Sequence, residues 1–66
     1  MLNRLQATAI KLKRIKKGLT VMQLAKKVGI TRTSLYNYEN GTQFPSPTII
    51  AKIAKALDCD IKELID

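Results

Sequence analysis

The sequence contains no histidine and only one cysteine, Cys59. One cysteine cannot form an internal disulfide, and without histidine the set of soft ligands is too small for a zinc site. Paired carboxylates, a glycine-rich phosphate loop and an activated serine or cysteine are also missing. We therefore expect no enzyme, no metal and no cofactor. We expect Cys59 to be a small buried apolar residue, with a redox role as the alternative.

Long apolar runs are missing as well. The apolar residues never continue for the roughly 18 positions that a membrane span requires, and residues 1–17 carry scattered charges rather than the plan of a signal peptide. We therefore expect a protein of the reducing cytoplasm with no membrane partner. The 66 residues should form one domain over residues 1–66, with no separate domain for a small-molecule ligand.

Acidic residues are few and unevenly placed. The formal net charge is +7, from 12 lysines and arginines against five acidic residues. Nine of the basic residues lie between Arg4 and Arg32, whereas four of the five acids lie in the last nine positions. The folded molecule should therefore have a basic end that can face phosphates and an acidic end that is kept away from DNA.

Residues 20–28 carry a start signal for a helix. The Thr20 side chain can accept the backbone N–H three residues on, while Gln23 reaches back to the amide of Thr20, as in a capping box. Gly29 follows where a left-handed residue would end the helix and turn the chain. The predicted helix has one apolar stripe at helical spacing, made of Leu24, Ala25 and Val28.

A second helix is predicted directly after this turn. Thr31 can cap a helix over residues 31–40, and Gly41 stands where that helix would end. Leu35 and Tyr38 should face inward, because they are three residues apart on a helix. Two short helices joined by a glycine turn are the arrangement in which a second helix enters a DNA groove.

The rest of this second helix presents a polar face. It mixes a guanidinium, a hydroxyl, a phenol and an amide, and such groups read base edges: arginine pairs with guanine and asparagine with adenine. The alternative is a surface helix that simply carries solvated polar residues, but the position after a glycine turn favours recognition. The residues expected to contact bases are Arg32, Thr33, Tyr36 and Asn37.

The flanking segments predict a helix on each side of this pair. A helix over residues 3–17 should close at Gly18, with lysines in its last turn that suit the negative end of the helix dipole. Ser46 can cap a later helix that has Pro47 in its first position. The inward stripe of that later helix is Ile50, Ile53, Ala54 and Leu57.

A last helix is expected near the end of the chain. Asp60 stands at its cap and Glu63 at the capping-box position, and Cys59 and Leu64 can pack together as an apolar staple. No linker, repeat or low-complexity stretch interrupts the sequence. The local signals therefore permit a compact bundle of four or five helices.

Several short motifs occur in an order that is specific only when they are taken together. They are Arg14 with Gly18-Leu19-Thr20, then Leu24-Ala25, Val28-Gly29, Leu35, Glu39-Asn40-Gly41, Pro45-Ser46, and Ile53-Ala54-Lys55-Ala56-Leu57. This pattern resembles the helix-turn-helix domain of phage repressors and Cro proteins, also called the XRE family. The resemblance implies an all-α fold, a compact lambda-repressor-like bundle of four to five helices with its helix-turn-helix at about residues 20–40.

The resemblance also implies a function. It suggests a sequence-specific DNA-binding transcriptional regulator, a repressor or Cro-like protein, that binds a pseudo-palindromic operator as a homodimer. One recognition helix reads only about 4 or 5 base pairs, whereas a two-fold pair reads two half-sites about one helical turn apart. The expected dimer contacts are Ile61, Leu64 and Ile65. The side chains expected on the DNA backbone are Thr20, Thr31, Ser34, Asn40, Thr42 and Gln43.

Arg14 and Glu39 form the most informative polar pair. In the resembled family, an arginine of the first helix and the glutamate that closes the recognition helix meet beneath the DNA-facing surface. Both residue types stand at the matching places in this sequence, so we expect a largely buried ion pair that leaves Arg14 unavailable to DNA. The alternative is that Arg14 is one more surface cation in a lysine-rich helix.

Two departures from the family pattern concern phosphate contacts. Many relatives carry glutamine directly after the cap of the first motif helix, where this chain has Val21, so that contact is missing. The loop that follows the recognition helix is often basic in relatives, whereas this chain has Thr42 and Gln43, which can offer only neutral donors. Phe44, in the same loop, is expected to pack beside the neighbouring prolines rather than stack on bases.

The helix predicted over residues 3–17 is apolar on two sides. Ile10 lies on one side, and Leu5, Leu12 and Ile15 form another stripe that is nearly opposite. A helix that is apolar on two sides is either deeply buried or in contact with a partner. We expect the last helix and the chain end to cover this second stripe.

Two other functions are open at this point. The chain could be an antitoxin or coregulator that uses the same fold to bind protein, but such an interaction surface would more often be apolar than the polar recognition face seen here. A weaker reading is nonspecific binding of nucleic acid or of an anionic membrane through the lysines of the first helix. That reading predicts no sequence preference.

Overall fold

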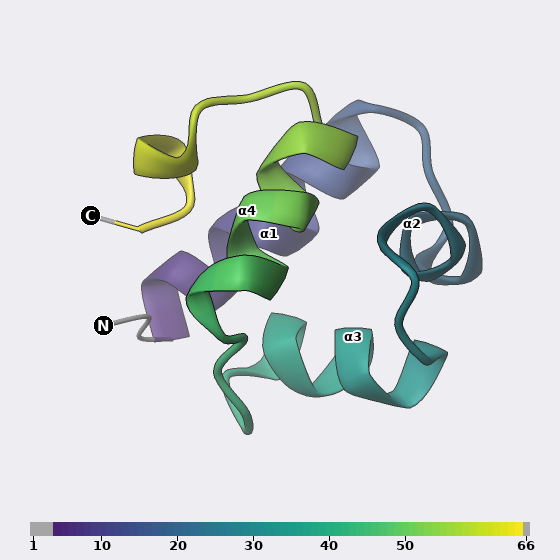
Figure 1. Ribbon diagram of the computed structural model, residues 1–66, viewed down its shortest axis with the longest axis horizontal. Coiled ribbons are helices and arrows are strands. Elements are labelled where there is room, and N and C mark those ends of the chain that lie inside the picture. Colours follow the sequence, from purple (N-terminus) through teal and green to yellow (C-terminus); the bar gives the residue numbers. More distant parts are fainter. Residues whose placement is uncertain (1–3, 66) are drawn as a thin grey trace.

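The computed structural model describes residues 4–65, which form four α-helices and one short 3₁₀ turn, with no strand in that range (Figure 1). This confirms the expected all-α bundle, with four α-helices rather than five. Figure 1 shows α3 along the lower edge of the molecule, α1 behind α4, and the last segment at the opposite end from α3. The elements are α1 (Arg4–Lys16), α2 (Val21–Val28), α3 (Arg32–Asn40), α4 (Pro47–Ala56) and the 3₁₀ turn η1 (Ile61–Glu63).

The predicted start signals cap their helices. The Thr20 hydroxyl oxygen accepts the Gln23 backbone N–H at 3.1 Å, and the Gln23 side-chain oxygen accepts the Thr20 N–H at 2.9 Å, so the capping box is complete. Thr31 caps α3 and Ser46 caps α4 through the backbone N–H three residues on. These bonds satisfy N–H groups that a helix cannot satisfy internally. The starts of these helices can therefore be predicted from the capping residues.

Gly29 makes the turn between α2 and α3. Its φ is +83° and its N–H donates to the Ala25 carbonyl at 2.8 Å. A Cβ at this position would meet no atom within 4 Å. Glycine is therefore required for the left-handed backbone alone, and that backbone sets the angle at which α3 leaves α2.

The core collects apolar side chains from all four helices and from the chain end. The predicted stripes of α2 and α4 are buried as expected, and so is Leu35 of α3. Tyr38 was expected to face inward, and it is half-buried against this core. The core residues are Ile10, Leu24, Ala25, Val28, Leu35, Ile50, Ile53, Ala54, Leu57 and Leu64.

The predicted last helix is wrong in type, because the chain forms only the single 3₁₀ turn η1. The start signal is present, since the Glu63 carboxylate accepts the Asp60 N–H at 2.9 Å, but the Glu63 N–H bonds to the Asp60 carbonyl in the shorter 3₁₀ pattern. A capping signal marks where a helix can start and not how long it becomes.

Leu64, expected at a dimer interface, is instead fully buried in the chain's own core. It fills that core from the last turn and is not free to contact a second subunit.

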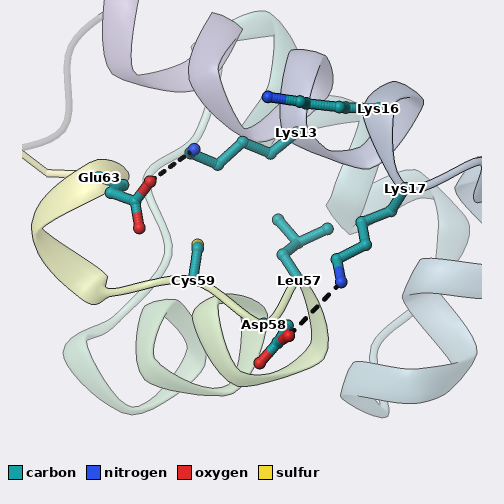
Figure 2. A pocket seen from close by; sticks show the side chains of 7 residues that line it. All are labelled: Lys13, Lys16, Lys17, Leu57, Asp58, Cys59 and Glu63. Carbon is teal, nitrogen blue, oxygen red and sulfur yellow. Dashed lines mark hydrogen bonds and ion pairs between the residues drawn. The ribbon is translucent and has the colours of Figure 1, made fainter.

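Two ion pairs tie the C-terminal segment to α1 and to the residue that follows it, as Figure 2 shows. Lys13 Nζ lies 2.9 Å from Glu63 Oε1, and Lys17 Nζ lies 3.6 Å from Asp58 Oδ2. The hydrogen bond from Lys13 lowers the pKa of Glu63 and raises the pKa of Lys13. Both groups are therefore charged near neutral pH, although exposed pairs of this kind add little stability.

Cys59 lies between these ion pairs, beside a surface pocket of about 340 Å³. The side chain is half-buried and packs against the core rather than being fully enclosed as expected. Burial raises the pKa of the Cys59 thiol. A raised pKa leaves the thiol protonated near neutral pH, so this is not the environment of an activated cysteine.

The expectation that the chain end covers the second apolar stripe of α1 is wrong for two of its residues. Leu12 is 59% exposed and Ile15 is 54% exposed. The side chain of Leu5 lies outside the described residues. The chain end packs elsewhere: Glu63 bonds to Lys13, which lies about 100° around α1 from Leu12, and the following leucine enters the core.

Candidate nucleic-acid interface

The structure brings Arg14 of α1 and Glu39 of α3 together in a two-point ion pair. Arg14 Nε donates to Glu39 Oε2 at 2.8 Å, and Arg14 Nη2 donates to Glu39 Oε1 at 3.2 Å. The third guanidinium nitrogen, Nη1, donates to the Leu19 carbonyl at 2.8 Å. The Arg14 and Glu39 side chains are only 11% and 4% exposed. Two nitrogens of Arg14 therefore anchor α3 to α1, the third holds the connection between α1 and α2, and none is left to bind DNA.

The polar residues of α3 face away from this anchor. Arg32, Thr33 and Tyr36 are exposed, with 49% of the Tyr36 side chain accessible, whereas Leu35 is fully buried on the other side of the helix. None of the ion pairs formed by residues 4–65 involves Arg32. The Arg32 guanidinium can therefore meet a new acceptor without breaking an existing ion pair.

Asn37 differs from its three predicted companions, because it is half-buried rather than openly exposed. Its side-chain Nδ2 donates to Gln43 Oε1 at 3.2 Å, and its backbone carbonyl accepts the N–H groups of Thr42 and Gln43. The side-chain amides of Asn37 and Gln43, six residues apart in the chain, are thus hydrogen-bonded to each other. The structure couples a predicted base-contacting residue to a predicted backbone-contacting residue, and the sequence reasoning missed this coupling because local spacing does not reveal it.

The residues expected on the DNA backbone lie at the N-terminal ends of α2 and α3, within α3, and in the loop that follows it. Thr20 and Thr31 are exposed at the N-terminal ends of α2 and α3, where free backbone N–H groups favour anions. The Thr31 hydroxyl also donates to Ser34 Oγ at 3.0 Å, and Ser34 is half-buried. At the other end of α3, the exposed residues are Asn40, Thr42 and Gln43.

Two residues at which the sequence departs from the family pattern differ in how far they are buried. Val21 is half-buried and packs against the core, so it adds to stability rather than to a polar contact. Phe44, which was expected to pack beside the neighbouring prolines, is 47% exposed, so any such packing covers only part of it. An exposed aromatic ring therefore stands in the loop after α3, next to the predicted phosphate donors.

The described residues offer no group of three or more metal-ligating side chains that could hold an ion. Among the same residues, no helix is long and apolar enough to cross a membrane. The candidate interface is thus an exposed polar helix that a buried ion pair holds in place, flanked by helix ends and a loop that can donate hydrogen bonds.

Comparison with known proteins places this geometry among regulators. A family model described as helix-turn-helix matches residues 10–64. The chain is 39% identical to the antitoxin HipB of Escherichia coli O6:H1, over 85% of this chain and 65% of that protein. It is 34% identical to the competence pilus inhibition repressor of Acinetobacter baylyi, over 85% of this chain and 51% of that protein. The chain thus spans about half to two thirds of the length of these relatives.

Among solved structures, SinR of Bacillus subtilis has been crystallised in complex with DNA. That structure is similar to this chain with a TM-score of 0.87 and 31% identity, over 92% of this chain and 98% of the other. The family match covers most of the chain, and the further relatives include an HTH-type transcriptional regulator of Archaeoglobus fulgidus and a 10 kDa protein of the immF control region of Bacillus phage phi105. The chain therefore belongs to the helix-turn-helix family of XRE-type DNA-binding regulators and phage repressors.

Proposed function

We propose that this protein is a sequence-specific transcriptional repressor that reads DNA with α3. The observation that carries the proposal is the exposed face of Arg32, Thr33 and Tyr36 on a helix that the Arg14–Glu39 pair holds from behind. Guanidinium, hydroxyl and phenol groups can meet the donors and acceptors of the major groove. Because the helix is already capped and held by the ion pair, little backbone freedom is lost when α3 docks.

We further propose that the protein binds an inverted repeat as a homodimer. One copy of α3 can cover only about 4 or 5 base pairs, which is too few for a specific site in a genome. Two copies related by a two-fold axis read two half-sites, so the symmetry of the operator follows from that of the protein. With Leu64 inside the core, Ile61 and Ile65 are the predicted dimer residues that stay partly accessible.

A second candidate function is that of an antitoxin-type module that binds a partner protein through the same fold. The 39% identity to a protein named antitoxin HipB favours this possibility. The two functions differ in what α3 must do. A protein-binding module needs no base preference along α3, whereas a repressor does.

Selection from random duplex DNA tests the proposal. Full-length protein should enrich an inverted repeat whose half-sites are centred about 10 base pairs apart, one helical turn. Enrichment of a single half-site by a monomer would contradict the dimer and leave base reading intact. If no sequence is enriched at all, the repressor function is wrong and the protein-binding module is favoured.

Replacing Arg32 with alanine should relax base preference at one position of each half-site. A bidentate arginine–guanine contact is worth about 1 to 3 kcal/mol of discrimination, so that position should accept other bases while the rest of the site is unchanged. Competition binding with duplexes substituted at single positions measures this. Lys52→Ala is the matched control, because Lys52 is an exposed cation on α4. An equal loss of affinity for every sequence would instead identify Arg32 as a phosphate contact.

A further inference from the structure

The outer face of α1 leaves two large apolar side chains in solvent. Leu12 is 59% exposed and Ile15 is 54% exposed, while Ile10, about half a turn away around the helix, is fully buried. Beside Leu12 lies a shallow groove of about 300 Å³, lined by Ala9, Leu12, Lys13 and Lys16. This face is not the recognition surface, because α1 meets α3 from its opposite side, through the buried arginine–glutamate pair.

Lysines border this apolar strip on both sides. On a helical projection, Lys11 lies beyond Ile15, and Lys16 and Lys13 lie beyond Leu12 on the other edge. Within residues 4–65, Lys13 forms an ion pair with a glutamate, whereas no ion pair involves Lys11 or Lys16. The two apolar side chains are therefore framed by positive charge. Glu63 neutralises Lys13, and no ion pair among the described side chains neutralises Lys11 or Lys16.

We propose that the outer face of α1 is a docking surface for an acidic amphipathic helix of a partner protein. Apolar residues three and four apart on that helix would cover Leu12 and Ile15, and acidic residues on its flanks would meet Lys11 and Lys16. α1 has 13 residues and is thus about 20 Å long, which matches three or four turns of a partner helix. An interface of that size is at the small end for protein complexes, so the association is transient.

Charge argues against a second copy of this chain on the same face. Two α1 helices packed face to face would bring Lys11, Lys13 and Lys16 of each copy toward the same residues of the other, and like charges repel. The small number of exposed apolar side chains, two among those described on α1, argues against a membrane, because insertion of a helix face needs a broad apolar surface. An acidic helix satisfies both the small apolar area and the charge.

The probe is a synthetic helical peptide with leucines at positions i, i+3, i+4 and i+7 and glutamates on its flanks, labelled for fluorescence anisotropy and titrated with the full chain. The matched peptide has lysine at every glutamate. We expect the acidic peptide to bind and the basic one not to. The double variant Leu12→Ser/Ile15→Ser should weaken binding roughly ten-fold, because two apolar contacts are lost.

Two protein variants control this measurement. Met22→Ser removes a side chain that is 58% exposed on α2 and should leave binding unchanged. Lys11→Glu/Lys16→Glu should weaken the acidic peptide and allow the basic peptide to bind, and it does so without touching the apolar strip. Circular dichroism should show the same helix content for every variant, and the Lys11/Lys16 charge reversal keeps the test decisive if the serine variant loses helix.

Five outcomes would overturn the proposal. Equal binding of both peptides, or equal loss with Met22→Ser, would mean unspecific apolar contact. Binding to vesicles of phosphatidylcholine and phosphatidylglycerol but not to the acidic peptide would identify a membrane face. Conversion of a dimer to a monomer by Leu12→Ser/Ile15→Ser in sedimentation would identify a self-interface. Loss of DNA affinity in that variant would place this face in the DNA interface, whereas unchanged DNA affinity separates it from the proposed repressor function.

Discussion

Replacing Glu39 with alanine should lower the free energy of unfolding by about 3 to 5 kcal/mol, because it leaves the Arg14 guanidinium buried without its partner. Arg14 would keep only the bond to the Leu19 carbonyl. For a domain of this size that loss is a large share of the total stability. Thermal and urea unfolding measure the effect, and DNA binding should weaken only as far as α3 is misplaced.

A double-mutant cycle separates the pair from its surroundings. Arg14→Ala, Glu39→Ala and the double variant should show strong coupling, and replacing both residues by apolar ones of similar size should recover much of the loss, since no buried charge remains. The matched control is the exposed pair of Lys13 and Glu63, whose coupling should be much smaller because water and salt screen it. A coupling near zero for the buried pair would refute its structural role.

DNA affinity should fall about 1,000-fold when salt rises from about 50 to about 200 mM, with a log–log slope of roughly −5 for a dimer that neutralises about 6 phosphates. Lysines near the helix ends supply the charge. The loop after α3 offers only neutral side chains, which places the slope in the lower part of the usual range. Fluorescence anisotropy titrations over a series of salt concentrations give the slope directly.

One substitution tests whether the loop after α3 faces phosphate. Thr42→Lys adds a charge to the exposed loop after α3 in each subunit, and it should steepen the slope by about 2 for a dimer if that loop faces phosphate. Lys62→Ala, at the η1 turn, should leave the slope unchanged, because η1 lies at the other end of the molecule from α3 (Figure 1). An affinity that does not respond to salt would contradict this interface altogether.

The sequence by itself determined where the helices begin and how α2 turns into α3. Thr20 and Gln23 cap α2, and Gly29 ends it, through bonds that span only three or four residues. Interactions over such short spans depend mainly on the residues that make them, so the sequence reveals them, although the same signal at Asp60 and Glu63 leads only to a 3₁₀ turn. The order of the short motifs likewise sufficed to identify the family.

Only the tertiary structure decided which apolar and polar residues are exposed to solvent. Leu12 and Leu64 are both leucines on helical turns, yet Leu12 is open to solvent and Leu64 is fully buried. Asn37 is half-buried, and its side chain is hydrogen-bonded to Gln43, because the loop after α3 folds back on it. Burial depends on which distant segments meet, and helical periodicity specifies a face of a helix but not the segment that covers it.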